Sequence, residues 1–181
     1  SRLSRARLSE GGAPLRSELF TNEQLAAHAR QLAATHRTEQ RMESNELLAN
    51  LAANEDVIRA FNQKTSEGDK DRRIAPAAEW LIDNFYLIEE QIQLARRHLP
   101  RGYSRELPRL VNTSSAGLPR VYDIILELIC HVDAQMDEEP LRAFIAAYQE
   151  VASLTLGELW AIPIMMRLGL IENLQRITNR L

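Results

Sequence analysis

Four histidines and one cysteine are the side chains best suited to metal binding or nucleophilic chemistry in this sequence of 181 residues. The histidines are His28, His36, His98 and His131. No two of them have the H-x-x-x-H spacing that puts two imidazoles on one helical face, so the spacing predicts no metal site. Cys130 lies in an apolar run, which predicts an inert core thiol. The sequence also lacks a glycine-rich phosphate loop and a G-x-S-x-G elbow.

Neighbouring carboxylates could in principle support glycoside chemistry. They occur at Glu89–Glu90 and at Asp137–Glu139. Such chemistry needs two carboxyl groups about 5–9 Å apart across a sugar, and nothing in the spacing fixes such a pair. We therefore interpret these carboxylates as the solvated faces of helices.

Polar residues inside the apolar segments predict a buried polar network. Its candidate members are Asp83, Asn84, Glu158, Arg167, Glu172 and Asn173. A charge on a buried helix must be paired, so we expect Arg167 to contact an acidic residue of another helix. The network would either fix the register of the helices or line a ligand pocket.

The segment from Arg96 to Arg120 gathers arginines and tyrosines in a stretch rich in proline. Its interaction candidates, with one residue just beyond it, are Arg101, Tyr103, Arg105, Arg120 and Tyr122. Their positive charge could hold an anionic group such as a nucleotide-sugar phosphate or a lipid headgroup. Alternatively, these arginines pair with acidic helices of the same domain.

A central helix over Ala75–Leu99 is the element around which the other helices would pack. Its apolar residues recur every three or four positions, at Ala77, Leu81, Phe85, Ile88, Ile92, Ala95 and Leu99. Trp80 and Tyr86 are expected to widen this apolar face. Pro76 suits the first turn, and Pro100 ends the pattern.

Further helices are predicted on both sides of this segment. Their approximate ranges are 21–36, 44–66, 119–134, 140–151 and 155–181. Capping boxes at Thr21 and Thr155 open two of them. Asn54 could interrupt the second helix, and Pro163 is expected to kink the last one. The fold class predicted is an all-α bundle of six to seven helices with one irregular loop rich in proline and arginine. A flexible basic leader, 1–17, precedes a single helical domain, 18–181.

The composition is that of a soluble globular protein. Hydrophobic residues make up 45% and charged residues 26%, and the net charge of −3 gives no field for nucleic acid. The longest apolar run, Leu159–Met166, is shorter than the ~20 residues of a membrane span. The sequence begins without Met and stops within a predicted helix, so we expect it to be part of a longer polypeptide.

Four blocks of the sequence, in this order, resemble a known family. They read AAEWLIDNFYLIEEQI, LPRGYSRELPRL, AGLPRVYDI and AYQEVASLTLGELWAIPIMMRLGLIENLQR. Together they resemble the N-terminal cytoplasmic helical region of bacterial cyclic β-1,2-glucan synthases, over about Ala75–Arg176. These large proteins also contain a membrane-embedded, UDP-glucose-dependent glycosyltransferase and a C-terminal domain like a glycoside phosphorylase.

The resemblance implies a place at the cytoplasmic face of the bacterial inner membrane. The implied partners are the glycosyltransferase and membrane domains of the same polypeptide, with β-glucan as a further candidate and no nucleic acid. UDP-glucose and a divalent metal would be used in those other domains, and no cofactor is expected here. The transferase motif of Q-x-x-R-W type, the membrane helices and the phosphorylase domain are missing from this sequence. No catalytic residue of the family can therefore be carried over.

Three hypotheses remain open at this point. The first is a non-catalytic accessory domain that docks or regulates the transferase and assists glucan initiation. The second is a carbohydrate-binding or glucan-acceptor module, with the acceptor on one of the four tyrosines, Tyr86, Tyr103, Tyr122 and Tyr148. The third is a stand-alone helical interaction protein that dimerises through its last helix.

Overall fold

The computed structural model describes residues 19–40, 46–67, 75–99, 106–132 and 138–181. These ranges hold seven helices, α1 (Asn22–Thr35), α2 (Glu46–Glu67), α3 (Pro76–Asp83), α4 (Phe85–His98), α5 (Arg120–His131), α6 (Glu138–Gln149) and α7 (Leu156–Thr178). The prediction of an all-α fold is confirmed. In the part of the chain described here, no helix combines the length and the hydropathy needed to cross a bilayer. The predicted leader, 1–17, and three loop candidates, Arg101, Tyr103 and Arg105, lie outside the described residues.

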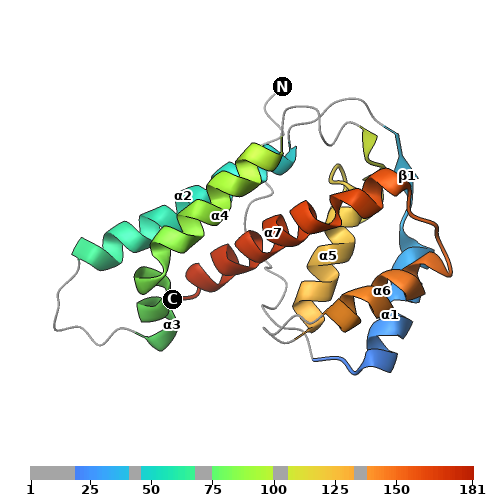
Figure 1. The fold of residues 1–181 in the computed structure, drawn as a ribbon, viewed down its shortest axis with the longest axis horizontal. Helices are drawn as coiled ribbons and strands as arrows, with labels where there is room; N and C mark the ends of the chain where they lie inside the picture. Colours follow the sequence, from blue (N-terminus) through green and yellow to red (C-terminus); the bar gives the residue numbers. More distant parts are fainter. Residues whose placement is uncertain (1–18, 41–45, 68–74, 100–105, 133–137) are drawn as a thin grey trace.

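The helices pack around two hydrophobic clusters that share α5. One cluster joins α5 and α7 to α2, α3 and α4, and the other joins α5 to α1 and α6. Figure 1 shows α7 running between these two groups of helices. Val121 and Ile125 of α5 belong to the first cluster, whereas Ile124 and Leu128 belong to the second. This explains why α5 is buried on almost every side.

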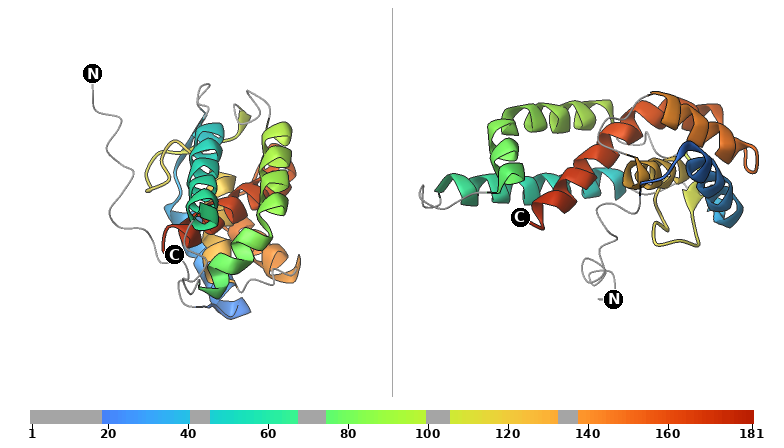
Figure 2. Two further views of the ribbon diagram at one scale, coloured as in Figure 1. Left: turned by 90° about the vertical axis from the view of Figure 1, so that its left-hand side faces the viewer. Right: turned by 90° about the horizontal axis from the view of Figure 1, so that it is seen from below.

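The predicted central helix is in fact two helices separated at Asn84. The backbone N–H and the side-chain amide of Asn84 both donate to the carbonyl of Trp80, at 3.1 and 2.8 Å. Asn84 has φ −105° and ψ 10°, outside the helical range, so the chain turns here. Figure 2 shows that α3 lies across the direction of α4.

The turn at Asn84 changes which residues of the stripe are buried. Five of the seven predicted positions are buried, namely Leu81, Ile88, Ile92, Ala95 and Leu99. Phe85 is half-buried and Ala77 is exposed. The prediction that Trp80 and Tyr86 widen the buried face is wrong, because these side chains are 56% and 68% exposed.

The predicted capping boxes at the starts of two other helices are confirmed. Thr21 and Thr155 both form complete capping boxes, with Gln24 and Glu158 respectively. The predicted interruption at Asn54 is wrong, since α2 continues through it. Helix α7 contains Pro163 without ending there, and the kink expected at this residue stays a prediction.

One short antiparallel ladder was not predicted. It joins β1 (Thr38–Glu39) to β2 (Arg109–Leu110). After β2 the chain reverses through Gly117, which has φ +94° and donates its N–H to the carbonyl of Leu110 at 2.8 Å. Strands of two residues are too short to produce an alternating pattern, which is why sequence analysis missed them.

Candidate functional site

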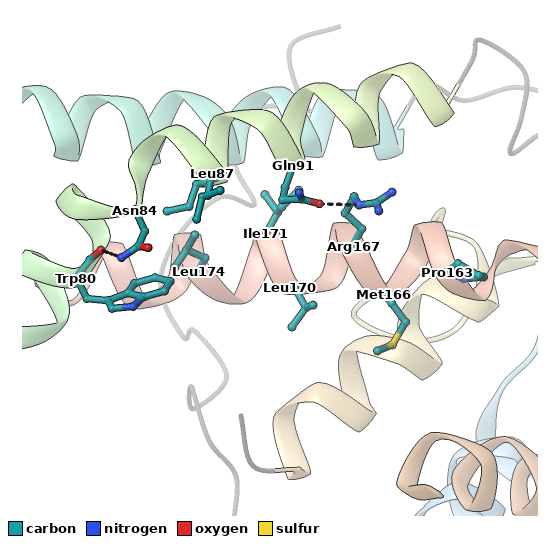
Figure 3. Close-up of a pocket in the computed structure, with 11 residues that line it drawn as sticks. Trp80, Asn84, Leu87, Gln91, Pro163, Met166, Arg167, Leu170, Ile171 and Leu174 are labelled. Carbon is teal, nitrogen blue, oxygen red and sulfur yellow. Dashed lines mark hydrogen bonds between the residues drawn. The ribbon is translucent and has the colours of Figure 1, made fainter. Parts of the chain in front are cut away.

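An apolar groove lies between the α3–α4 pair and α7. Its volume is about 460 Å³, and Figure 3 shows the side chains that line it. From the first pair of helices come Trp80, Asn84, Leu87, Ile88 and Gln91, and from α7 come Pro163, Met166, Arg167, Leu170, Ile171 and Leu174. The turn at Asn84 positions Trp80 at one end of the groove.

Three large apolar side chains of the groove are in contact with water. Trp80 is 56% exposed, Leu170 is 49% exposed and Leu87 is 40% exposed. Single exposed apolar residues are ordinary on a protein surface, but a contiguous set around a groove is typical of a binding surface. The groove is therefore the candidate functional site.

Arg167 and Gln91 bridge the groove where α4 faces α7. The Nε of Arg167 donates to Oε1 of Gln91 at 3.2 Å, as Figure 3 shows. The sequence predicted a carboxylate as the partner of Arg167, and the contact is instead to a neutral amide, within the ranges described here. Arg167 is only half-buried, so water shares in solvating its charge and an acidic partner is not required.

Asp83 and Asn84 do not join the other predicted network residues. Asp83 is exposed at the end of α3, and Asn84 is half-buried at the helix break. The apolar residues before Asp83 belong to α3 and those after Asn84 belong to α4. The apolar stripe predicted from the sequence is therefore not one continuous helical face. Asn84 is the residue that ends α3 and precedes α4, and its side-chain amide donates to the carbonyl of Trp80.

Arg120 and Glu158 form a buried ion pair between α5 and α7. Arg120 Nε donates to Glu158 Oε1 at 2.9 Å, and Arg120 Nη2 donates to Oε2 at 2.7 Å. Arg120 Nη2 also donates to the carbonyl of Ser153 at 3.1 Å. Burial opposes the charge of Arg120, but the hydrogen bonds and the charge of Glu158 outweigh it and raise the pKa of the guanidinium. The arginine proposed as an anion binder therefore already has a carboxylate partner inside the protein.

Tyr122 and Glu172 form a second buried contact between the same two helices. Tyr122 is 1% exposed and its hydroxyl donates to Glu172, which also accepts from Arg176. Burial and then the charge of Glu172 raise the pKa of Tyr122 well above its usual value. Asn173 follows Glu172 in α7, and its buried Oδ1 has no hydrogen-bond partner among the described residues.

A third polar cluster was not predicted at all. The Nε2 of His36 lies 3.0 Å from Asp123 Oδ2, and its Nδ1 lies 2.9 Å from the hydroxyl of Tyr148. Ser115 donates to the other oxygen of Asp123. Burial raises the pKa of Tyr148 to about 12. No sequence signal connects these four residues, because they come from four separate segments.

The residues predicted to form one buried polar network instead make separate contacts in different parts of the structure. Arg120 with Glu158, and Tyr122 with Glu172, tie α5 to α7 and have their partners within the domain. They act as structural cross-links rather than as a ligand pocket. The groove, in contrast, presents apolar walls with two amides and one guanidinium at its surface. Such a surface favours binding of a partner over the making or breaking of bonds.

No protein-family model matches the chain. The chain is similar to the cyclic β-(1,2)-glucan synthase NdvB of Rhizobium meliloti (strain 1021), with 37% identity over 125 residues, which is 69% of this chain. The matched stretch spans only 4% of the length of that relative. This similarity confirms the resemblance seen in the four sequence blocks. The chain is therefore related to the cyclic β-(1,2)-glucan synthase family.

Proposed function

We propose that this chain is a non-catalytic helical accessory domain of a membrane glycosyltransferase like the cyclic β-(1,2)-glucan synthases. In this proposal it acts at the cytoplasmic face of the bacterial inner membrane and docks the UDP-glucose-dependent transferase part of the same polypeptide. The observation that carries the proposal is the groove with three exposed apolar side chains, Trp80, Leu87 and Leu170. Its occupant is an apolar helical face of that transferase part.

The energetics favour a docking role for this groove. Covering exposed apolar surface favours association, and tryptophan is enriched among the residues that contribute most to binding energy at protein interfaces. The match to a small part of a very long relative leaves ample polypeptide to supply the covering surface. The charges of Arg120 and Glu158 are paired inside the protein and do not line the groove, so they do not compete with an apolar partner there.

The test is made in the full-length polypeptide that carries this domain. Trp80→Glu combined with Leu87→Glu puts charges into the interface, and we expect glucose transfer from UDP-glucose in membranes to fall at least about 10-fold. Leu19→Glu is the matched control, because Leu19 is 49% exposed and does not line the groove. Unchanged transfer by the double variant, at normal expression, would contradict docking through this surface.

Photo-crosslinking provides a direct readout of the same contact. A photoreactive residue at position 87 should form crosslinks to the transferase part of the polypeptide, and one at position 19 should not. The isolated chain is expected to transfer no glucose from UDP-glucose, and transfer by the chain alone would refute a non-catalytic role. A native polypeptide with no transferase attached would instead favour a stand-alone interaction protein.

The exposure of Trp80 also favours a second candidate function, carbohydrate binding. An indole that is 56% exposed and lies beside the amides of Asn84 and Gln91 offers a stacking face and hydrogen-bond groups for a sugar. In a Trp160→Phe background the fluorescence of Trp80 alone can be titrated with β-1,2-glucan. A saturable change would support this function, and an unchanged signal would contradict it.

A glucan-acceptor role would require an accessible tyrosine. Among the described residues Tyr122 and Tyr148 are fully buried, whereas Tyr86 is 68% exposed on α4. Tyr86 is thus the candidate acceptor in the described ranges. Peptide mass analysis of the full-length protein would show hexose on the peptide that carries Tyr86, and its absence there would exclude this residue.

A further inference from the structure

Two histidines and one glutamate from distant parts of the sequence meet between α1 and α5. The Nε2 of His28 lies 2.9 Å from Glu127 Oε2, and the Nε2 of His131 lies 3.8 Å from the same oxygen. One ligand atom from each of the three residues lies within 4.8 Å of the other two. Glu127 and His131 are four residues apart in α5, so their side chains share one helical face.

The geometry points to a binding site for a divalent transition-metal ion such as Zn²⁺, held by His28, Glu127 and His131. Two imidazoles with one carboxylate form a recognised ligand set for Zn²⁺, whose fourth position takes water. Bonds of about 2.0–2.2 Å in tetrahedral geometry place ligand atoms about 3.3 Å apart. In the structure, Glu127 Oε2 lies 2.9 Å from Nε2 of His28 and 3.8 Å from Nε2 of His131, on either side of this value.

Aromatic packing orients the two imidazoles. The ring of Phe20 stacks on His131, with centroids 3.9 Å apart and planes 8° apart. The backbone N–H of Phe20 also donates to the carbonyl of His131 at 3.1 Å. The rings of His28 and His131 meet edge to face at 4.8 Å. Ligands that are already held in place lose little conformational entropy when the ion binds.

Water has access to the cluster from the side of His28 and Glu127. Their side chains are 25% and 37% exposed, whereas that of His131 is 8% exposed. An ion can therefore enter from solvent while one of its ligands stays anchored in the core. Because His28 is in α1 and the other two ligands are in α5, a bound ion would clamp α1 onto α5.

The test uses the untagged chain of 181 residues after treatment with a chelator, at pH 7.5, with Zn²⁺ as the probe. We expect one Zn²⁺ per chain to remain after gel filtration, measured by elemental analysis. At a Zn²⁺ concentration 100 times its Kd, the Tm should rise by about 5–10 °C and return on addition of chelator. Failure of both measurements, with no retained ion and no rise in Tm, would overturn the proposal.

Substitutions of the proposed ligands test whether the ion binds at these residues. We expect His28→Gln and Glu127→Gln each to weaken Zn²⁺ binding on the order of 100-fold and to abolish the rise in Tm. His98→Gln and Cys130→Ser are the controls, since His98 is exposed on α4 and Cys130 is the one thiol of the chain. Both controls should retain binding. Stoichiometric binding that survives His28→Gln and Glu127→Gln would place the ion elsewhere and overturn the proposal.

Discussion

Arg120 and Glu158 form a bidentate ion pair that joins the start of α5 to the first turn of α7. The side chain of Glu158 is 0% exposed and that of Arg120 is 10% exposed. Glu158 also accepts from the backbone N–H of Thr155 at 2.8 Å, so one carboxylate caps a helix and neutralises a buried guanidinium. This contact therefore helps to fix the orientation of α7 on α5.

Loss of the Glu158 charge should destabilise the fold strongly. Glu158→Gln leaves Arg120 as a buried charge without a carboxylate, and we expect the free energy of unfolding to fall by about 3–5 kcal/mol. Urea denaturation measures this change. Adding Arg120→Met to Glu158→Gln removes the unpaired charge and keeps a residue that can complete the capping box, so part of the stability should return. Removing the exposed pair Arg142–Glu138 should have little effect.

The hydroxyl of Tyr122 should contribute to stability and not to chemistry. Tyr122→Phe removes the hydrogen bond to Glu172, and we expect a loss of about 1–2 kcal/mol in the free energy of unfolding. Arg176 continues to pair with Glu172, which limits the loss. Tyr86→Phe is the control, because this tyrosine is exposed and its replacement should leave the denaturation midpoint unchanged. Equal effects of the two substitutions would contradict this assignment.

Alkaline pH should weaken the fold through Tyr148. Its pKa is about 12 in the folded protein, above the ordinary value of 10.0, because burial disfavours the phenolate. The unfolded chain therefore releases this proton first, and the stability present below about pH 10 is lost as the pH rises toward 12. The loss from this group is on the order of 2–3 kcal/mol. Denaturation midpoints measured between pH 9 and pH 11.5 should fall less steeply in Tyr148→Phe than in the parent.

Gly169 should be required for the close approach of α7 to α5. A Cβ at this position would lie 2.7 Å from Cδ1 of Ile129, so Gly169→Ala forces the isoleucine to move. We expect a loss of about 1–3 kcal/mol in the free energy of unfolding, partly offset by the better helix propensity of alanine. In an Ile129→Val background, which lacks Cδ1, the same substitution should be neutral or stabilising. Gly157→Ala, whose nearest contact is 3.9 Å away, should not destabilise the fold.

Much of the fold was predictable because its signals are local. Capping boxes at Thr21 and Thr155 act over three residues, and apolar residues such as Ile88 and Ile92 recur within one helical turn. The all-α class followed from these signals alone. The break at Asn84 was missed, because asparagine within an apolar stripe is compatible both with a continuous helix and with a cap.

The candidate site was predictable only in part. The sequence singled out Asn84 and Arg167, which line the groove, as unusual polar residues. Four others, Arg120, Tyr122, Glu158 and Glu172, do not line it and pair with one another instead. The sequence placed Trp80 in the core, whereas the turn at Asn84 leaves this side chain at the edge of a groove. Whether a given apolar residue is covered depends on the neighbouring helix and not on its own spacing.

The sequence by itself determined the helical class, most helix boundaries and the relationship to the glucan synthase family. Only the tertiary structure decided that Arg120 meets Glu158 and that His28 meets Glu127 and His131. The physical reason is the distance along the sequence over which the two kinds of contact act. Helix formation depends on contacts three or four residues apart, whereas these pairings join residues 38 and 99 positions apart and depend on how whole helices pack.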